Sequence, residues 1–201
     1  MDWRCDINDV LAATWRQNAE GCTKITEDLT RYRAVIEKVH PTLIVECGTY
    51  NGGSALWFAN TANCPVITFD INDIVSGKTH SQWAGRVTHL VASSTSPEAQ
   101  HLVHSTVSPD DRVLLVLDSD HALHHVLAEL EAYASIATYI VVEDGIVRWM
   151  SDFEQSQYIG NPLDAIETWF PTHPEWVEDT EIAEMSPITM HPRGWWMKVD
   201  N

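Results

Sequence analysis

The chain has 201 residues, of which 44% are hydrophobic and 20% charged, values typical of a globular domain rather than a disordered chain. Its formal net charge of −17, with only 12 Lys and Arg residues, argues against nucleic acid and acidic membrane surfaces as partners. No apolar run approaches the roughly 20 residues of a membrane span, and the N-terminus does not resemble a signal peptide. The four cysteines form no CxxC pair. We therefore expect a cytoplasmic protein with reduced thiols and neither a membrane nor a nucleic-acid partner.

Hydrophobic spacing predicts two amphipathic helices first, at Ile7–Gln17 and Glu27–Val39, and Pro41 ends the second. Strands and helices then alternate, with strands at Leu43–Val45, Val66–Phe69, Val87–Val91, Val113–Leu117 and Tyr139–Val142, and helices at Ser54–Asn60, Pro97–Val107 and Ala122–Tyr133. A late strand at Trp195–Val199 fits an antiparallel sheet edge. This alternation predicts an α/β, three-layer Rossmann-like fold with a mostly parallel sheet. Without linkers or repeats, residues 1–201 form one domain, with N-terminal helices in 1–39 and the core in 40–201.

A glycine-containing turn follows the first strand and runs directly into a helix, from Glu46 to Ser54. Glycine lets the backbone turn sharply and approach a ligand, and such sheets bind cofactors beside this first turn. Asp70 ends the next strand, 22 residues after Gly48, where an acid commonly binds the ribose hydroxyls of a nucleoside cofactor. The spacing is Gly-x-x-x-Gly-Gly rather than GxGxxG, which suits S-adenosylmethionine (SAM), a cofactor without phosphate, with Asn51 and Ser54 as donors. The alternative is a turn that binds no ligand.

Carboxylates close the fourth and fifth strands, at Asp118 and at Glu143-Asp144. Parallel strands bring them to the same sheet edge as the glycine turn, with no adjacent Lys or Arg in the sequence. A hard divalent cation such as Mg²⁺ would relieve their repulsion, so we predict Asp118, Glu143 and Asp144 as metal ligands. The alternative is that Asp118 caps the next helix and Glu143-Asp144 is a solvated turn.

His121 lies three residues after Asp118, close enough to take a proton from a substrate hydroxyl whose pKa a metal ion lowers. We therefore predict His121 as the general base. His121 and His125 also have the four-residue spacing of zinc ligands, but no HExxH glutamate lies between them. The sequence alone leaves open whether Asp118 or Asp120 is the direct ligand; we choose Asp118, which ends the strand, and assign Asp120 a supporting role beside the ion.

Three motifs together carry a family resemblance: Val45 to Ser54, Leu117 to His121 and Val142 to Asp144. They resemble the cephalosporin hydroxylase / rhamnosyl O-methyltransferase family, whose metal site is similar to that of macrolide sugar O-methyltransferases. The resemblance implies a class I methyltransferase fold with seven strands, the last antiparallel. It also implies a SAM site and an Mg²⁺ site built on the acids above, with His121 as general base. The cofactor contacts predicted are Glu46, Gly48, Thr49, Tyr50, Asn51, Gly52, Ser54, Asp70, Ser93, Ser94 and Asp118.

The segment between Tyr133 and Tyr139 departs from that family pattern because it is short and lacks the usual Pro-Gly turn. On the substrate side, Trp149, Met150 and Phe153 are candidates for an acceptor wall, whereas Trp169, Trp176, Trp195 and Trp196 are expected mainly in the core. The first two helices either cover the acceptor site or form a contact within a homo-oligomer.

The leading hypothesis is a SAM-dependent, Mg²⁺-assisted O-methyltransferase acting on a hydroxyl of a small acceptor, such as a sugar or a glycosylated natural product. The alternatives are an NAD-dependent oxidoreductase and a non-catalytic partner protein that keeps the methyltransferase fold.

Overall fold

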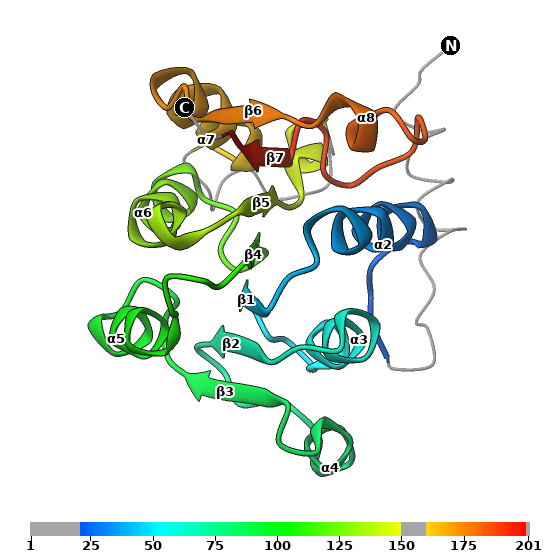
Figure 1. Ribbon diagram of the computed structural model, residues 1–201, viewed down its shortest axis with the longest axis vertical. Helices are drawn as coiled ribbons and strands as arrows, with labels where there is room; N and C mark the ends of the chain where they lie inside the picture. The colour runs from blue at the N-terminus through cyan, green and yellow to red at the C-terminus, as the bar shows by residue number, and fades with distance from the viewer. Residues whose placement is uncertain (1–20, 150–159, 200–201) are drawn as a thin grey trace.

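A computed structural model describes residues 21–149 and 160–199 and shows a seven-stranded sheet between two layers of helices (Figure 1). The strands are β1 Leu43–Cys47, β2 Val66–Asp70, β3 Val87–Val91, β4 Val113–Leu117, β5 Tyr139–Val142, β6 Trp176–Glu178 and β7 Trp195–Lys198. The α-helices are α2 Thr26–Val39, α3 Gly53–Ala62, α4 Gly77–Trp83, α5 Pro97–Thr106, α6 Leu123–Tyr133, α7 Pro162–Trp169 and α8 Thr180–Ala183. The helix predicted at Ile7–Gln17 lies outside the described residues, as do Met150 and Phe153.

The strand order is β3-β2-β1-β4-β5-β7-β6, with parallel pairing from β3 to β5 and antiparallel pairing of β7 with both β5 and β6. This confirms the predicted mostly parallel Rossmann-like sheet. The central strands are short apolar runs buried on both faces, as β4 with the sequence VLLVL illustrates. The carboxyl ends of β1, β2, β4 and β5 consequently meet at one edge of the sheet.

Each face of the sheet has its own hydrophobic core. Helices α5, α6 and α7 cover one face, and α2, α3 and α8 cover the other (Figure 1). The expectation that the late tryptophans belong to the core is confirmed, because Trp169, Trp176, Trp195 and Trp196 are all buried. Trp196 stacks on Phe170, with ring centroids 3.8 Å apart, and so ties α7 to the antiparallel edge.

Several short elements were not predicted from the sequence. Residues 77–83 form α4. Ser76 is its N-cap, and the Ser76 side chain accepts a hydrogen bond from the backbone N–H of Thr79. Helix α7 begins with a capping box between Asn161 and Asp164. The connection between α6 and β5 that lacks Pro-Gly is made by a 3₁₀ turn, η1 Ala134–Ile136. Among the described residues, no helix combines the length and apolar character that crossing a membrane requires.

Candidate active site

Gly48, the residue that follows β1, packs against Asp118, the residue that follows β4. Its φ of +101° is one that side-chain-bearing residues rarely adopt, and a Cβ built on it would lie 1.9 Å from the carbonyl oxygen of Asp118. The backbone N–H of Asp118 donates to the carbonyl of Cys47 at 2.8 Å. Only glycine permits this close approach, which sets the glycine turn directly against the first predicted metal ligand.

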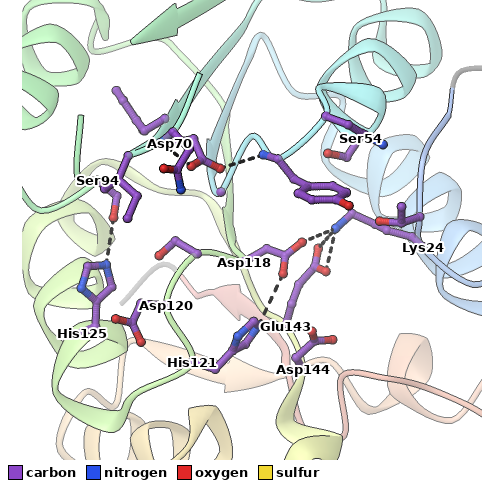
Figure 2. Close-up of a pocket in the computed structure, with 18 of the residues that line it drawn as sticks. Lys24, Ser54, Asp70, Ser94, Asp118, Asp120, His121, His125, Glu143 and Asp144 are labelled. Atoms are coloured by element: carbon purple, nitrogen blue, oxygen red, sulfur yellow. Dashed lines mark hydrogen bonds and ion pairs between the residues drawn. The ribbon is translucent and has the colours of Figure 1, made fainter. Parts of the chain in front are cut away.

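Asp70 ends β2 and faces the glycine turn (Figure 2). Its two carboxylate oxygens accept hydrogen bonds from the backbone N–H groups of Tyr50, at 2.8 Å, and Asn72, at 2.9 Å. These bonds hold the carboxylate at the cavity edge while each oxygen keeps a further lone pair for a ligand. The position therefore suits the predicted ribose contact.

A cavity of about 760 Å³ lies at this sheet edge, within the size range of small-molecule sites. It brings together most of the residues predicted from the sequence: Gly48, Tyr50, Asn51, Ser54, Asp70, Ser93, Ser94, Asp118, His121, Glu143 and Asp144. Residues at the carboxyl ends of the five parallel strands, β1 to β5, thus share one pocket with Lys24 from the segment before α2.

Three predicted cofactor contacts do not line the cavity. Glu46 is fully buried under the turn and accepts a hydrogen bond from Thr68 at 2.7 Å, and burial raises its pKa to about 7. Thr49 is buried and bonds Thr68 through its hydroxyl at 2.8 Å. Gly52 has a φ of +78° and packs against the ring of Trp83. These residues shape the turn from below instead of facing the cavity.

Ser94 belongs to a polar network at the far side of the cavity (Figure 2). Its hydroxyl donates to the buried carboxylate of Glu129 on α6 and lies 3.1 Å from Nε2 of His125. Ser119 donates to the same Glu129 oxygen at 2.5 Å. The sequence showed polar atoms but no acid after β3, and the structure supplies an acid here from α6.

The three carboxylates predicted as metal ligands converge as expected, but they differ in surroundings. Glu143 is buried, and burial together with the charge of Asp118 raises its pKa to about 7. Asp118 and Asp144 are about one-quarter exposed. Asp118 does not cap α6, whose N-cap is Ala122 without a side-chain cap, and buried Glu143 is not part of a solvated turn. Both parts of the alternative interpretation are therefore wrong.

His121 lies between two of these acids. Its Nε2 is 3.2 Å from Asp144 Oδ2 and 3.7 Å from Asp118 Oδ1, and these three ligand atoms are close enough to share an ion. Burial lowers the pKa of His121, but the two carboxylates outweigh it and raise the pKa to about 11. Among the groups of potential ligands formed by the described residues, none joins His121 to His125. His125 instead forms a hydrogen bond with Ser94. The two histidines with the spacing of zinc ligands therefore contact different partners.

Sequence reasoning missed three residues of the acidic cluster: Lys24, Tyr32 and His191. The Lys24 ammonium pairs with Asp118 and Glu143, and the Tyr32 hydroxyl donates to Glu143. Nδ1 of His191 accepts a hydrogen bond from the backbone N–H of Asp144 at 3.0 Å. None of the three belongs to a local motif, and each reaches the cluster from a segment far from the strand ends in the sequence.

Comparison with known proteins identifies the family. The chain matches the family described as Rhamnosyl O-methyltransferase/CmcI over residues 12–199, which is nearly its whole length. It belongs to this family. Proteins named rhamnosyl O-methyltransferase from Mycobacterium bovis and Mycobacterium tuberculosis are each 29% identical to it over 185 residues, covering 86% of this chain and 74% of theirs.

Solved structures agree with the fold. A Mg–SAM form of CmcI has a TM-score of 0.62 and 18% identity, covering 93% of this chain and 78% of that one. An O-methyltransferase from Bacillus cereus in complex with SAH has a TM-score of 0.51 and 16% identity, covering 87% and 80%. Membership of the rhamnosyl O-methyltransferase/CmcI family makes this chain a SAM-dependent O-methyltransferase. The oxidoreductase and non-catalytic alternatives are set aside.

Proposed function

We propose that this enzyme transfers the methyl group of SAM to a sugar hydroxyl, such as that of a rhamnosyl unit, with the help of a divalent cation. The observation that carries the proposal is one cavity that combines a ribose-type acid, Asp70, with a cluster of three carboxylates. The curated relatives are named for a rhamnosyl acceptor, which supports a sugar as the substrate class.

The cofactor half of the site is proposed at the β1–β2 side of the cavity. Asp70 would accept hydrogen bonds from the ribose hydroxyls, since its carboxylate is held in place by two backbone donors. The turn at Gly48 and Tyr50 would pass beside the ribose of the cofactor, and Ser94 would lie toward its adenine. SAM supplies the methyl group when it is bound.

The residues of the acidic cluster fit a divalent cation, because a ligand atom of Asp144 lies within 4.8 Å of one from Asp118 in one group of potential ligands and of one from Glu143 in another. Such an ion, Mg²⁺ in our proposal, would hold the acceptor hydroxyl and lower its pKa. In the reaction, a bond forms between the acceptor oxygen and the methyl carbon as the carbon–sulfur bond breaks. The hydroxyl proton must leave, and His121 is proposed to accept it at Nε2. His121 can do so only when the charge of Asp118 and Asp144 is neutralised, since these acids otherwise keep it protonated.

The test is methyl transfer from labelled SAM to a panel of rhamnosylated and other glycosylated acceptors. We expect a methyl ether on the sugar, with activity lost in EDTA and restored by Mg²⁺. Asp144→Asn should reduce kcat at least about a hundredfold, whereas Asp73→Asn, an exposed acid outside the cavity, should leave it unchanged. Full activity in EDTA would contradict the role of the cation. Methylation of non-glycosylated acceptors alone would contradict the sugar.

A further inference from the structure

A second group of metal-ligating side chains lies outside the cavity, at the outer edge of the sheet. It consists of Asp73 in the loop after β2, His80 in α4 and His89 in the edge strand β3. One ligand atom of each residue lies within 4.8 Å of the other two, and none of the three residues lines the cavity. They meet because the chain between the paired strands β2 and β3 folds into α4, at the β3 edge of the sheet (Figure 1).

The two imidazoles lie beside each other, against a fixed aromatic ring. The ring centroids of His80 and His89 are 6.0 Å apart, and the Trp83 ring packs 4.5 Å from His80 and 5.8 Å from His89. Trp83 is buried, and its indole N–H donates to the Gly52 carbonyl at 3.3 Å. The indole therefore forms an immobile wall beside the two histidines.

His89 carries a nitrogen that lacks a partner. Its Nε2 is covered from solvent, and within the part of the chain that the structure describes it makes no hydrogen bond. Leaving a buried polar atom unsatisfied costs about 1–3 kcal/mol, so such an atom calls for an explanation, and an ion is one. Asp73 and His80 are exposed, so an ion from solvent can reach the group.

The ligand types select the class of ion. Imidazole nitrogen suits Zn²⁺ and related transition-metal ions, whereas Mg²⁺ takes oxygen ligands and keeps several waters. Two histidines and one carboxylate form a known ligand set for zinc, with water in the fourth position. Ligand atoms around a tetrahedral zinc ion lie about 3.4 Å apart, so these side chains need to move by about an ångström. Asp73 and His80 can do so because they are exposed.

We propose that Asp73, His80 and His89 form a second metal site, which binds a transition-metal ion such as Zn²⁺ and fastens α4 and the loop before it to β3. The site goes beyond the proposed function, because it lies outside the cavity and takes a different class of ion. Helix α4 has only seven residues, of which Trp83 alone is buried, so an ion would mainly stabilise this helix. Methyl transfer with Mg²⁺ does not depend on the ion.

The test follows each histidine by NMR in full-length protein labelled with ¹⁵N-histidine, as Zn²⁺ is added. The imidazole nitrogens of His80 and His89 should shift, and His80→Ala and His89→Ala assign their signals. The signal of His101, an exposed histidine of α5 that belongs to no group of potential ligands, should stay in place. Because each of the ten histidines is read separately, zinc at this site is distinguished from zinc in the cavity.

Calorimetry gives the size of the effect. It is carried out with Asp144→Asn as the starting protein, because the acidic cluster in the cavity could also take zinc. Adding His80→Ala or Asp73→Asn should weaken Zn²⁺ binding at least about tenfold, since loss of even an outer partner of a metal ligand costs about 10–100-fold. Adding His101→Ala, the matched control, should change nothing. His80 is exposed, so its removal leaves the fold intact.

Hydrogen exchange tests the structural consequence. Zn²⁺ should slow exchange of the α4 backbone amides in the wild type but not in His80→Ala. Unshifted signals of His80 and His89, with zinc bound elsewhere or not at all, would overturn the proposal, as would equal zinc affinity with and without His80. Methyl transfer that persists in EDTA would refute the cation of the proposed function and leave this site unaffected.

Discussion

The contact of Gly48 with Asp118 can be tested by adding one methyl group. Gly48→Ala places a Cβ 1.9 Å from the Asp118 carbonyl oxygen and 2.6 Å from its carbon, and both are backbone atoms of a central strand end. The φ of +101° adds its own cost of roughly 1–2 kcal/mol for a residue with a Cβ. Overlap with backbone that cannot move freely adds about 1–3 kcal/mol. We expect Gly48→Ala to lower the free energy of unfolding by about 2–5 kcal/mol in all.

Gly85→Ala separates the two contributions. Gly85 has a similar left-handed φ of +78°, but a Cβ there would meet no atom within 4 Å. It should cost about 1–2 kcal/mol, the conformational part alone. Urea denaturation of both variants gives the difference, and SAH titration shows whether the folded fraction of Gly48→Ala still binds the cofactor product. Equal destabilisation by the two substitutions would refute the close-contact argument.

Three further predictions concern the proposed cofactor contact Asp70, the buried acid Glu46 beneath the glycine turn, and Arg31 of helix α2. Asp70→Asn should weaken SAH binding about 10–100-fold in calorimetry. The amide has fewer acceptor sites than the carboxylate, and its NH₂ group must face one of the two backbone donors. Asp73→Asn, the control, should have no effect. Burial raises the pKa of Glu46 in the folded protein to about 7, above its ordinary value of 4.5, so the wild type loses stability as the pH rises through this interval. Glu46→Gln should gain about 2–3 kcal/mol in the free energy of unfolding relative to wild type between pH 5 and pH 8. A difference that does not change with pH would contradict this. Arg31→Leu should lower the free energy of unfolding by about 3–5 kcal/mol, since it removes the guanidinium that pairs with buried Asp28 and the hydrogen bonds to the carbonyls of Ile182 and Ile188. Exposed Arg33→Leu should cost under about 1 kcal/mol.

The central sheet was predictable because each strand is an apolar run bounded by polar residues. The run of β4 and the turn at Gly48 carry this signal locally, so the order of elements and the edge that bears the cavity followed from the sequence. Strand β6 did not, because Trp176–Glu178 has only three residues and is placed by its pairing with β7. Helix α4 lacked a clear apolar face, since Trp83 is its one buried residue.

In the candidate site, too, some residues could be predicted from the sequence and others could not. Asp70, Asp118 and Asp144 follow strands directly, so the topology of a parallel sheet alone brings them together. Lys24 and His191 reach the cluster through the packing of segments that precede and follow the central strands, and no spacing in the sequence encodes that meeting. The absence of Lys or Arg beside the acids in the sequence was therefore misleading, because the counter-charge comes from a distant segment.

The contact between Gly48 and Asp118 also has a thermodynamic consequence. The backbone of the cofactor turn rests on the residue whose carboxylate belongs to the ion cluster, so a shift at either position is felt at the other. Binding at the two positions is then linked, and linkage is reciprocal. Whatever factor SAH contributes to the affinity for the ion, the ion must contribute the same factor to the affinity for SAH. Titrating each ligand in the presence and absence of the other would measure, as one number, how strongly the two halves of the site are coupled.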